Sequence, residues 1–296
     1  MPAPQDAVSV PLLRFAPSPN GRLHFGHAYS ALLNDDVARR LGGRCLLRIE
    51  DIDPGRSRPE LIGAIEEDLA WLGLTYERPM RRQSEHMGVY RRALDQLIER
   101  RLVYPCFCSR GTIRARVAQM QAAGTRIIVD PDGTPIYPGT CRTMSDEQSA
   151  QLRSRGAPHT WRLDMARALD VAPYPFGFRC FEPDGSGADV PADPSRWGDA
   201  VIARRDVPTS YHLSVVLDDD AQGISHIVRG ADLLAATDLH VLLQRLLGLR
   251  SPAYHHHRLI MAEDGEKLAK SRGSETLGDL RARGVTSAEI RAKLGF

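Results

Sequence analysis

The stretch VSVPLLRFAPSPNGRLHFGH, residues 8–27, decides the fold of this 296-residue chain. Residues 8–16 are rich in β-branched and apolar side chains and predict a strand, which the turn-forming run at 17–21 ends. Apolar residues at helical spacing follow, and a second strand at 45–49 leads to a second helix at 59–72. Alternating strands and helices are typical of a parallel sheet with crossover helices, so we expect an α/β fold.

The rest of the chain interrupts this alternation once. Residues 104–142 hold three of the five cysteines and a Gly/Pro-rich stretch, which indicates an inserted subdomain. The other expected elements are an amphipathic helix at 86–101, a loop at 183–194, buried strands at 201–203, 213–217 and 224–228, a long helix at 231–247, a strand at 253–260, a polar loop at 262–274 and a last short helix opened by a capping box of Thr286 and Glu289.

Composition argues against several classes of protein. The 42% hydrophobic and 26% charged content is that of a globular chain, and no apolar stretch is long enough to predict a membrane span. The first ten residues contain no Lys or Arg and lead to no apolar segment, so we expect no secretory signal and a cytoplasmic protein. A net charge of +2 does not by itself predict a nucleic-acid partner. Five cysteines without an export signal argue against disulfides.

Two segments are candidates for binding a nucleotide. His24, Gly26 and His27 stand where the first helix begins, and helix N-termini beyond a parallel strand attract phosphate. Lys267 and Lys270, two of only three lysines in the chain, lie on a polar loop with Ser271 and suit a charge clamp over a triphosphate. The alternatives are a surface helix start with incidental histidines and an ordinary solvated loop.

A third set of residues suits a substrate with two carboxylates and one amine. Arg14, Glu50 and Arg229 stand at the ends of expected strands, and Tyr211 is a fourth candidate. Arginine pairs with carboxylates through two hydrogen bonds, while a glutamate can hold an ammonium group. Solvated strand ends are the alternative interpretation for each residue alone.

The inserted segment carries a candidate metal site. Cys106, Cys108 and Cys141 offer three thiolates, and zinc takes four ligands in a tetrahedron. Tyr137 or His159 is the candidate for the fourth position, and reduced, partly buried thiols are the alternative. The two other cysteines, at positions 45 and 180, are expected to be small core residues.

Five motifs resemble the catalytic domain of class I glutamyl-tRNA synthetases and occur in that family's order. They are RFAPSP at 14–19, HFGH at 24–27, RIEDID at 48–53, VRGAD at 228–232 and KLAKS at 267–271. HFGH resembles the HIGH signature, with Phe25 in place of Ile, and KLAKS resembles the KMSKS loop, with Leu268 and Ala269 in its variable places. The resemblance spans about residues 12–273.

The resemblance implies a Rossmann-like doubly wound parallel sheet with an inserted zinc-containing subdomain. The implied organisation is a nucleotide-binding catalytic domain in two halves, 1–103 and 201–274, an insert resembling an acceptor-binding module at 104–200 and a short helical tail at 275–296.

Roles carried over by motif are of three kinds. The ATP-binding residues are His24, Gly26, His27, Lys270 and Ser271, with His24, His27, Lys267 and Lys270 catalytic and Mg²⁺ accompanying ATP. The glutamate-binding residues are Arg14, Ala16, Ser18, Glu50, Tyr211 and Arg229. One structural zinc per chain would be held by Cys106, Cys108, Tyr137 and Cys141.

A glutamyl-tRNA synthetase continues beyond its KMSKS loop into an anticodon-binding domain, whereas this chain ends about 25 residues later. The closer resemblance is to the short paralogous family that attaches glutamate to queuosine in the anticodon of tRNA(Asp). It implies a monomeric enzyme with tRNA(Asp), L-glutamate and ATP as partners and no membrane contact. The alternatives are a truncated synthetase that charges a tRNA 3′ end, a non-catalytic zinc-containing tRNA-binding module and a small-molecule nucleotidyltransferase.

Overall fold

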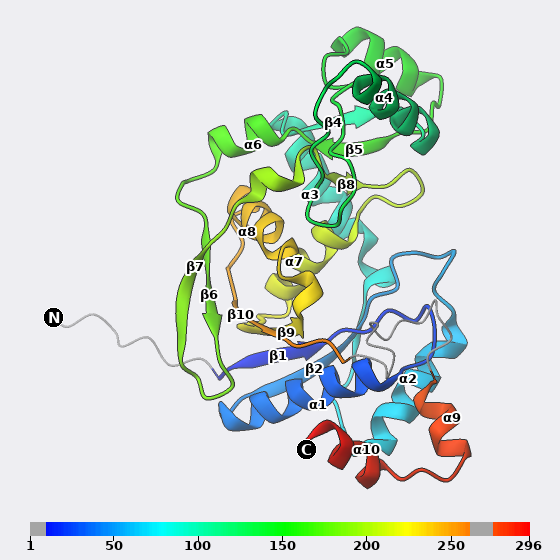
Figure 1. The fold of residues 1–296 in the computed structure, drawn as a ribbon, viewed down its shortest axis with the longest axis vertical. Helices are drawn as coiled ribbons and strands as arrows, with labels where there is room; N and C mark the ends of the chain where they lie inside the picture. Colours follow the sequence, from blue (N-terminus) through cyan, green and yellow to red (C-terminus); the bar gives the residue numbers. More distant parts are fainter. Residues whose placement is uncertain (1–9, 261–274) are drawn as a thin grey trace, which may run out of the picture.

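The computed structural model describes residues 10–260 and 275–296 (Figure 1), so the predictions for Lys267, Lys270 and Ser271 lie outside the described residues. The first sheet is parallel and starts with the predicted strand: β1 (Leu12–Phe15) pairs with β2 (Arg44–Ile49), which pairs with β3 (Arg81–Arg82). Helix α1 (Phe25–Arg40) connects β1 to β2 and runs below them in Figure 1, and α2 (Pro59–Trp71) follows β2.

A second sheet continues the first. Its order is β7 (Gly187–Pro191), β6 (Gly177–Phe181), β10 (Ala253–His257) and β9 (His226–Gly230), parallel except for the β6–β7 hairpin. Ser225, just before β9, donates its backbone N–H to the Leu12 carbonyl oxygen of β1 at 2.9 Å. The sheets therefore meet edge to edge, which confirms the predicted Rossmann-like α/β fold with a parallel sheet.

A third sheet, antiparallel, lies apart from the others near the top of Figure 1. It consists of β4 (Val103–Cys106), β5 (Thr160–Leu163) and β8 (Val201–Ala203). α4 (Arg110–Ala122) and α5 (Asp146–Ser154) lie beside it, and α4 buries none of its residues. β6 and β7, although they fall within 104–200, pair with the catalytic sheet through β10.

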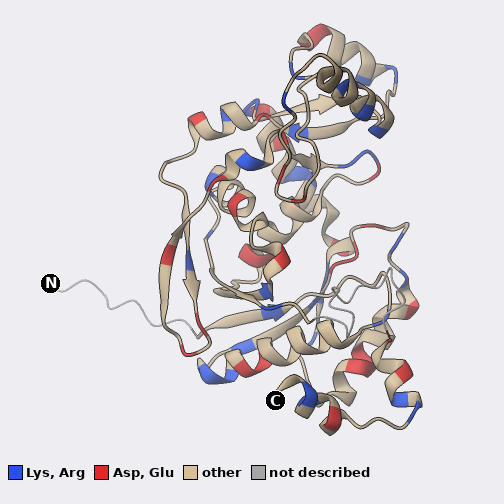
Figure 2. Cartoon of the chain, in the orientation of Figure 1, with Lys and Arg blue, Asp and Glu red and all other residues tan. Residues whose placement is uncertain are grey.

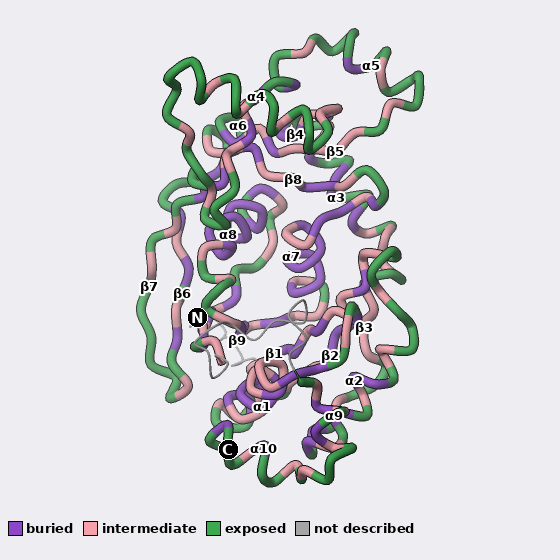
Figure 3. Tube along the Cα trace, turned by 45° about the vertical axis from the view of Figure 1, so that its right-hand side comes forward, coloured by how far each residue is buried: buried purple, intermediate pink, exposed green. Residues whose placement is uncertain are grey.

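The main core lies where helices cover the second sheet. The other described helices are α3 (Met87–Glu99), α6 (Met165–Val171), α7 (Tyr211–Ala221), α8 (Ala236–Leu247), α9 (Leu277–Ala282) and α10 (Ser287–Leu294), with 3₁₀ turns η1 (Gln83–His86), η2 (Pro194–Trp197) and η3 (Ala231–Leu233). α7 and α8 are buried along most of their length (Figure 3). They pack with β9 and β10 into one apolar cluster.

Four sequence predictions are wrong in detail. Residues 213–217 form part of helix α7, because a fully buried helix shows the same continuous apolar run as a buried strand. The expected loop at 183–194 contains β7, whose edge position tolerates its glycine and proline. The helix expected at 231–247 starts as η3 and becomes α8 only at Ala236, and the strand expected at 253–260 ends at His257.

Charge is distributed over the whole molecule. Figure 2 shows acidic and basic residues in all parts of the described chain, in keeping with the net charge of +2. Among the described residues, no helix is long and apolar enough to cross a membrane.

Candidate functional site

A cavity of about 550 Å³ lies at the carboxyl ends of β1, β2 and β9. Ligands of parallel α/β sheets bind at such strand ends. The cavity brings together every predicted nucleotide-binding and glutamate-binding residue that the structure describes: Arg14, Ala16, Ser18, His24, Gly26, His27, Glu50, Tyr211 and Arg229. These residues are spread over more than 200 positions of sequence, so the fold alone juxtaposes them.

The two histidines cap helix α1, and their ring centroids lie 3.9 Å apart. His24 is the N-cap, and its Nδ1 accepts the Gly26 backbone N–H at 3.1 Å. His27 Nδ1 in turn accepts the His24 backbone N–H at 3.3 Å. Because both Nδ1 atoms accept, each neutral imidazole carries its proton on Nε2 and can donate it to an anionic oxygen. A Cβ on Gly26 would lie 3.1 Å from the His24 ring, which explains the glycine.

Arg14 belongs to a buried charge network. Asp219, on α7, accepts hydrogen bonds from Arg14 Nε at 3.0 Å and from Arg48 Nη1 at 2.7 Å. Arg48, fully buried on β2, also donates from Nη2 to Glu50 Oε1 at 3.1 Å. Burial raises the pKa of Glu50 against the opposing effects of Arg48 and Arg14. The network fixes one arginine and one carboxylate of the cavity wall.

Arg229, on β9, has a different environment. Its Nη2 donates to Thr237 Oγ1 at 2.7 Å, and its Nη1 lies 3.1 Å from His240 Nδ1. Its Nε lies 3.5 Å from His256 Nε2. These partners are uncharged acceptors, in contrast to the carboxylate that holds Arg14. Tyr211, the first residue of α7, also lines the cavity, and burial raises the pKa of its hydroxyl.

Sequence reasoning missed Asp219, Thr237, His240 and His256. Because residues 213–217 were predicted to be a strand, the sequence did not indicate that Asp219 lies on a helix and contacts β1 and β2. His240 looked like a polar interruption of an apolar run. His255, next to His256 in sequence, has a different partner, since its Nδ1 lies 3.0 Å from the Phe181 carbonyl oxygen.

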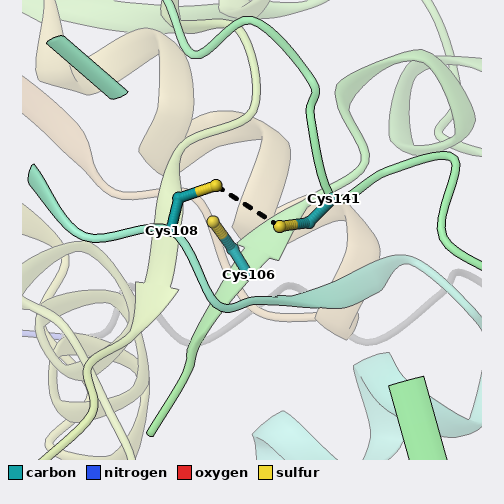
Figure 4. Close-up of side chains that lie close together, drawn as sticks. All are labelled: Cys106, Cys108 and Cys141. Carbon is teal, nitrogen blue, oxygen red and sulfur yellow. Dashed lines mark hydrogen bonds between the residues drawn. The ribbon is translucent and has the colours of Figure 1, made fainter. Parts of the chain in front are cut away.

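The three predicted cysteines form a cluster (Figure 4). The sulfur atoms of Cys106, Cys108 and Cys141 all lie within 4.8 Å of one another, and those of Cys108 and Cys141 are 3.5 Å apart. Zinc bound to thiolates at about 2.3 Å in a tetrahedron separates its sulfur ligands by about 3.8 Å, so the cluster fits that ion.

Tyr137 is the fourth residue of this cluster. Its hydroxyl accepts the Cys141 backbone N–H at 2.9 Å and lies 3.4 Å from Cys108 Sγ. His159, the other candidate, directs Nδ1 toward the Ala157 carbonyl oxygen at 3.0 Å and is not part of the cluster that the described residues form. The geometry favours Tyr137 over His159.

Two adjacent arginines connect the end of β4 to the segment that follows β2. Arg205 Nη2 donates to the Cys108 carbonyl oxygen at 2.6 Å, and Arg204 Nη1 donates to Asp53 Oδ2 at 2.7 Å. Asp53 follows Glu50 by three residues, and Tyr211 lies shortly after the two arginines. The arginine pair therefore links the segment of Cys108 to the segment just after Glu50.

The comparisons with known proteins agree on the family of this chain, whose relatives carry more than one name. Residues 11–293 match the family model "tRNA synthetases class I (E and Q), catalytic domain". A protein of Rhodobacter capsulatus named glutamyl-Q tRNA(Asp) synthetase is 44% identical over 96% of this chain and 100% of its own length. One of the same name from Symbiobacterium thermophilum is 38% identical over 96% of this chain and 85% of its own.

A solved glutamate tRNA ligase from Elizabethkingia meningosepticum, in complex with its amino acid, is similar in structure. It has a TM-score of 0.69 and 27% identity, with 89% of this chain and 52% of that chain covered. The chain thus spans about half the length of that ligase.

Proposed function

The chain belongs to the class I tRNA synthetase family for glutamate and glutamine and is a ligase with a glutamate–tRNA ligase-like function, and from this premise we propose that it transfers activated glutamate to queuosine in the anticodon of tRNA(Asp). The observation that carries the proposal is one cavity lined by the start of α1, two arginines and a glutamate. That set matches the charges of ATP and of an amino acid with two carboxylates.

The first step is activation of glutamate. Arg14 and Arg229 bind its carboxylates, Glu50 binds its ammonium group, and Ala16, Ser18 and Tyr211 complete the pocket. The reacting carboxylate attacks the α-phosphate of ATP, and pyrophosphate leaves. His24 and His27 donate hydrogen bonds to phosphate oxygens, and Gly26 allows the nucleotide to approach the backbone.

The predicted KMSKS-like residues Lys267, Lys270 and Ser271 complete the proposed ATP site, with Mg²⁺ accompanying the triphosphate. Two lysines and a cation offset the negative charge that builds up on the leaving pyrophosphate. Their contribution is proposed from sequence, since they lie outside the described residues.

The second step is transfer of glutamate. A ring hydroxyl of queuosine attacks the carbonyl carbon of glutamyl-adenylate, an ester bond forms, and AMP leaves with the bond electrons. Relatives that this chain matches over 96% of its length carry the name glutamyl-Q tRNA(Asp) synthetase, which favours queuosine over a tRNA 3′ end.

We propose one structural zinc per chain, held by Cys106, Cys108, Tyr137 and Cys141. Bound there, the ion would hold the 137–141 turn to the end of β4. The inserted subdomain at 104–200 would then present a fixed surface to tRNA beside the catalytic halves 1–103 and 201–274. We place the enzyme in the cytoplasm as a monomer.

The test is transfer of labelled glutamate, with ATP and Mg²⁺, to two preparations of tRNA(Asp) that differ only in queuosine. Labelling of the queuosine form alone supports the proposal. Labelling of neither, with tRNA(Glu) charged instead, would overturn the choice of acceptor and leave a minimal synthetase. An absence of glutamate-dependent ATP–pyrophosphate exchange would overturn activation itself.

A further inference from the structure

Arg229 is a buried guanidinium held by neutral groups. It is 4% exposed, and its described hydrogen bonds go to Thr237, His240 and His256. Arg14, which also lines the cavity, is instead paired to the carboxylate of Asp219. A buried positive charge without a carboxylate partner is costly, so a site of this kind favours an anionic ligand.

The hydrogen-bond donors of Arg229 fix the tautomer of each neighbouring histidine. A guanidinium has only donors, so His240 Nδ1 must offer a lone pair and its proton is on Nε2. That Nε2 lies 3.2 Å from His212 Nδ1, which therefore accepts. The chain of contacts from Arg229 through His240 to His212 has one consistent set of proton positions, with every imidazole neutral.

A second branch follows the same logic. Thr237 Oγ1 accepts from Arg229 Nη2, so its own hydrogen points to His256 Nε2 at 2.9 Å. His256 Nε2 is thus an acceptor as well, and the proton of this ring is on Nδ1. Both branches restrict rotation of the guanidinium, because Thr237 and His240 are buried on α8.

The electrostatics of the cluster keep these rings uncharged. Burial, and then Arg229, lower the pKa of His212 to about 4 and that of His256 to about 3, and lower the pKa of His240 well below its usual value. His240 faces Arg14 and Arg229 from the two strands beside it, while Asp232 acts in the opposite sense on His256.

We propose that His240 and Thr237 are positioning residues, which hold the guanidinium of Arg229 with neutral acceptors and leave its charge for a carboxylate of the amino-acid substrate. This inference rests on the proposed function, since it assigns Arg229 to glutamate. A carboxylate in place of either acceptor would neutralise Arg229 internally, whereas a neutral acceptor orients it without competing with the substrate.

The experiment measures glutamate-dependent ATP–pyrophosphate exchange for two pairs of variants. His240→Leu and Thr237→Val each remove one acceptor, and each should raise the KM for glutamate about 10-fold while kcat and the KM for ATP stay near the parent values. His240→Gln and Thr237→Ser retain an acceptor and should restore most of the affinity. His255→Gln, on the same strand as His256 but bonded to Phe181, is the matched control and should behave as the parent.

The outcomes separate the inference from the proposed function. A parent protein without exchange overturns the proposed function and, with it, this inference. If the parent is active but the His240→Leu and Thr237→Val variants have the parent's KM for glutamate, the inference alone is overturned. An equal rise of the KM for glutamate in the Thr237→Val and Thr237→Ser variants would also overturn the inference, since the hydroxyl would then contribute nothing beyond packing.

Discussion

Thr276 pairs with His24 in an isolated antiparallel bridge, and each of the two residues is the N-cap of a helix. The Leu277 N–H donates to the Leu23 carbonyl oxygen at 2.8 Å beside this bridge. The segment that follows the KLAKS motif is therefore fixed to the start of the helix that carries the HFGH motif. Residues about 250 positions apart in sequence thus share one backbone connection.

This relationship predicts that Thr276→Val raises the KM for ATP. The substitution removes the Thr276 hydroxyl, which accepts the Asp279 N–H at 3.1 Å, and loosens the cap beside His24. Thr286→Val removes the same type of cap from α10, away from the cavity, and is the matched control. Each variant should lose about 1 kcal/mol of unfolding free energy, but only Thr276→Val should affect ATP. Equal KM values for ATP in the two variants would contradict the coupling.

Asp219→Asn should destabilise the folded protein by about 3–5 kcal/mol, because it leaves two buried guanidinium groups without their shared carboxylate. Urea unfolding measures the loss. Asp220→Asn is the control: the adjacent carboxylate pairs with Arg250 at the surface and should contribute less than about 1 kcal/mol. A similar loss of unfolding free energy in both variants would contradict the stabilising role of the buried network.

The same carboxylate predicts a pH dependence of stability. Burial raises the pKa of Asp219, but Arg14 and Arg48 outweigh it and hold the pKa below its usual value. The stability it contributes is therefore present above the unfolded-state pKa, about 3.9, and is lost as the pH falls through the folded-state value. The decrease in unfolding free energy on acidification should therefore be smaller in Asp219→Asn than in the parent, as urea unfolding at several pH values measures.

The sequence correctly predicted the elements that depend on residues close together in the chain. The first strand, the helix at the HFGH motif and the capping box of Thr286 and Glu289 follow from neighbouring residues and are confirmed. Hydrophobic periodicity did not predict which residues share the cavity. That prediction came from the order of the family motifs along the chain.

Contacts between distant residues could not be predicted in this way. Arg14 and Asp219 are 205 positions apart, and the register of α7 decides that Asp219 rather than Asp220 faces β1. A buried helix and a buried strand have the same apolar signature, so the acceptors of Arg14 and Arg48 stayed hidden. The contact of His240 with Arg229 was not predicted for a related reason: the sequence around a histidine in a buried helix does not indicate its partner.

Cys141→Ser should abolish stoichiometric zinc binding, because serine supplies no thiolate to the cluster. Metal analysis of the purified protein measures it, with about one zinc expected per parent chain. Cys180→Ser, which changes a cysteine outside the cluster, should keep the parent's zinc. Tyr137→Phe should retain zinc but release it at a roughly 10-fold lower chelator concentration. Unchanged zinc in Cys141→Ser would remove that residue from the ligand set.

Glu50→Gln should raise the KM for glutamate about 10- to 100-fold, because the amide keeps an acceptor for Arg48 but loses the charge that binds the ammonium group. Since burial raises the pKa of Glu50 against the effect of Arg48, the parent's KM should also rise as the pH falls through that raised value. Glu50→Gln should lack this acid limb. Exchange kinetics across pH measure both effects, with Glu182→Gln as the control at an exposed carboxylate. An acid limb of equal size in Glu50→Gln would assign the titration to another group and leave Glu50 without the ammonium-binding role.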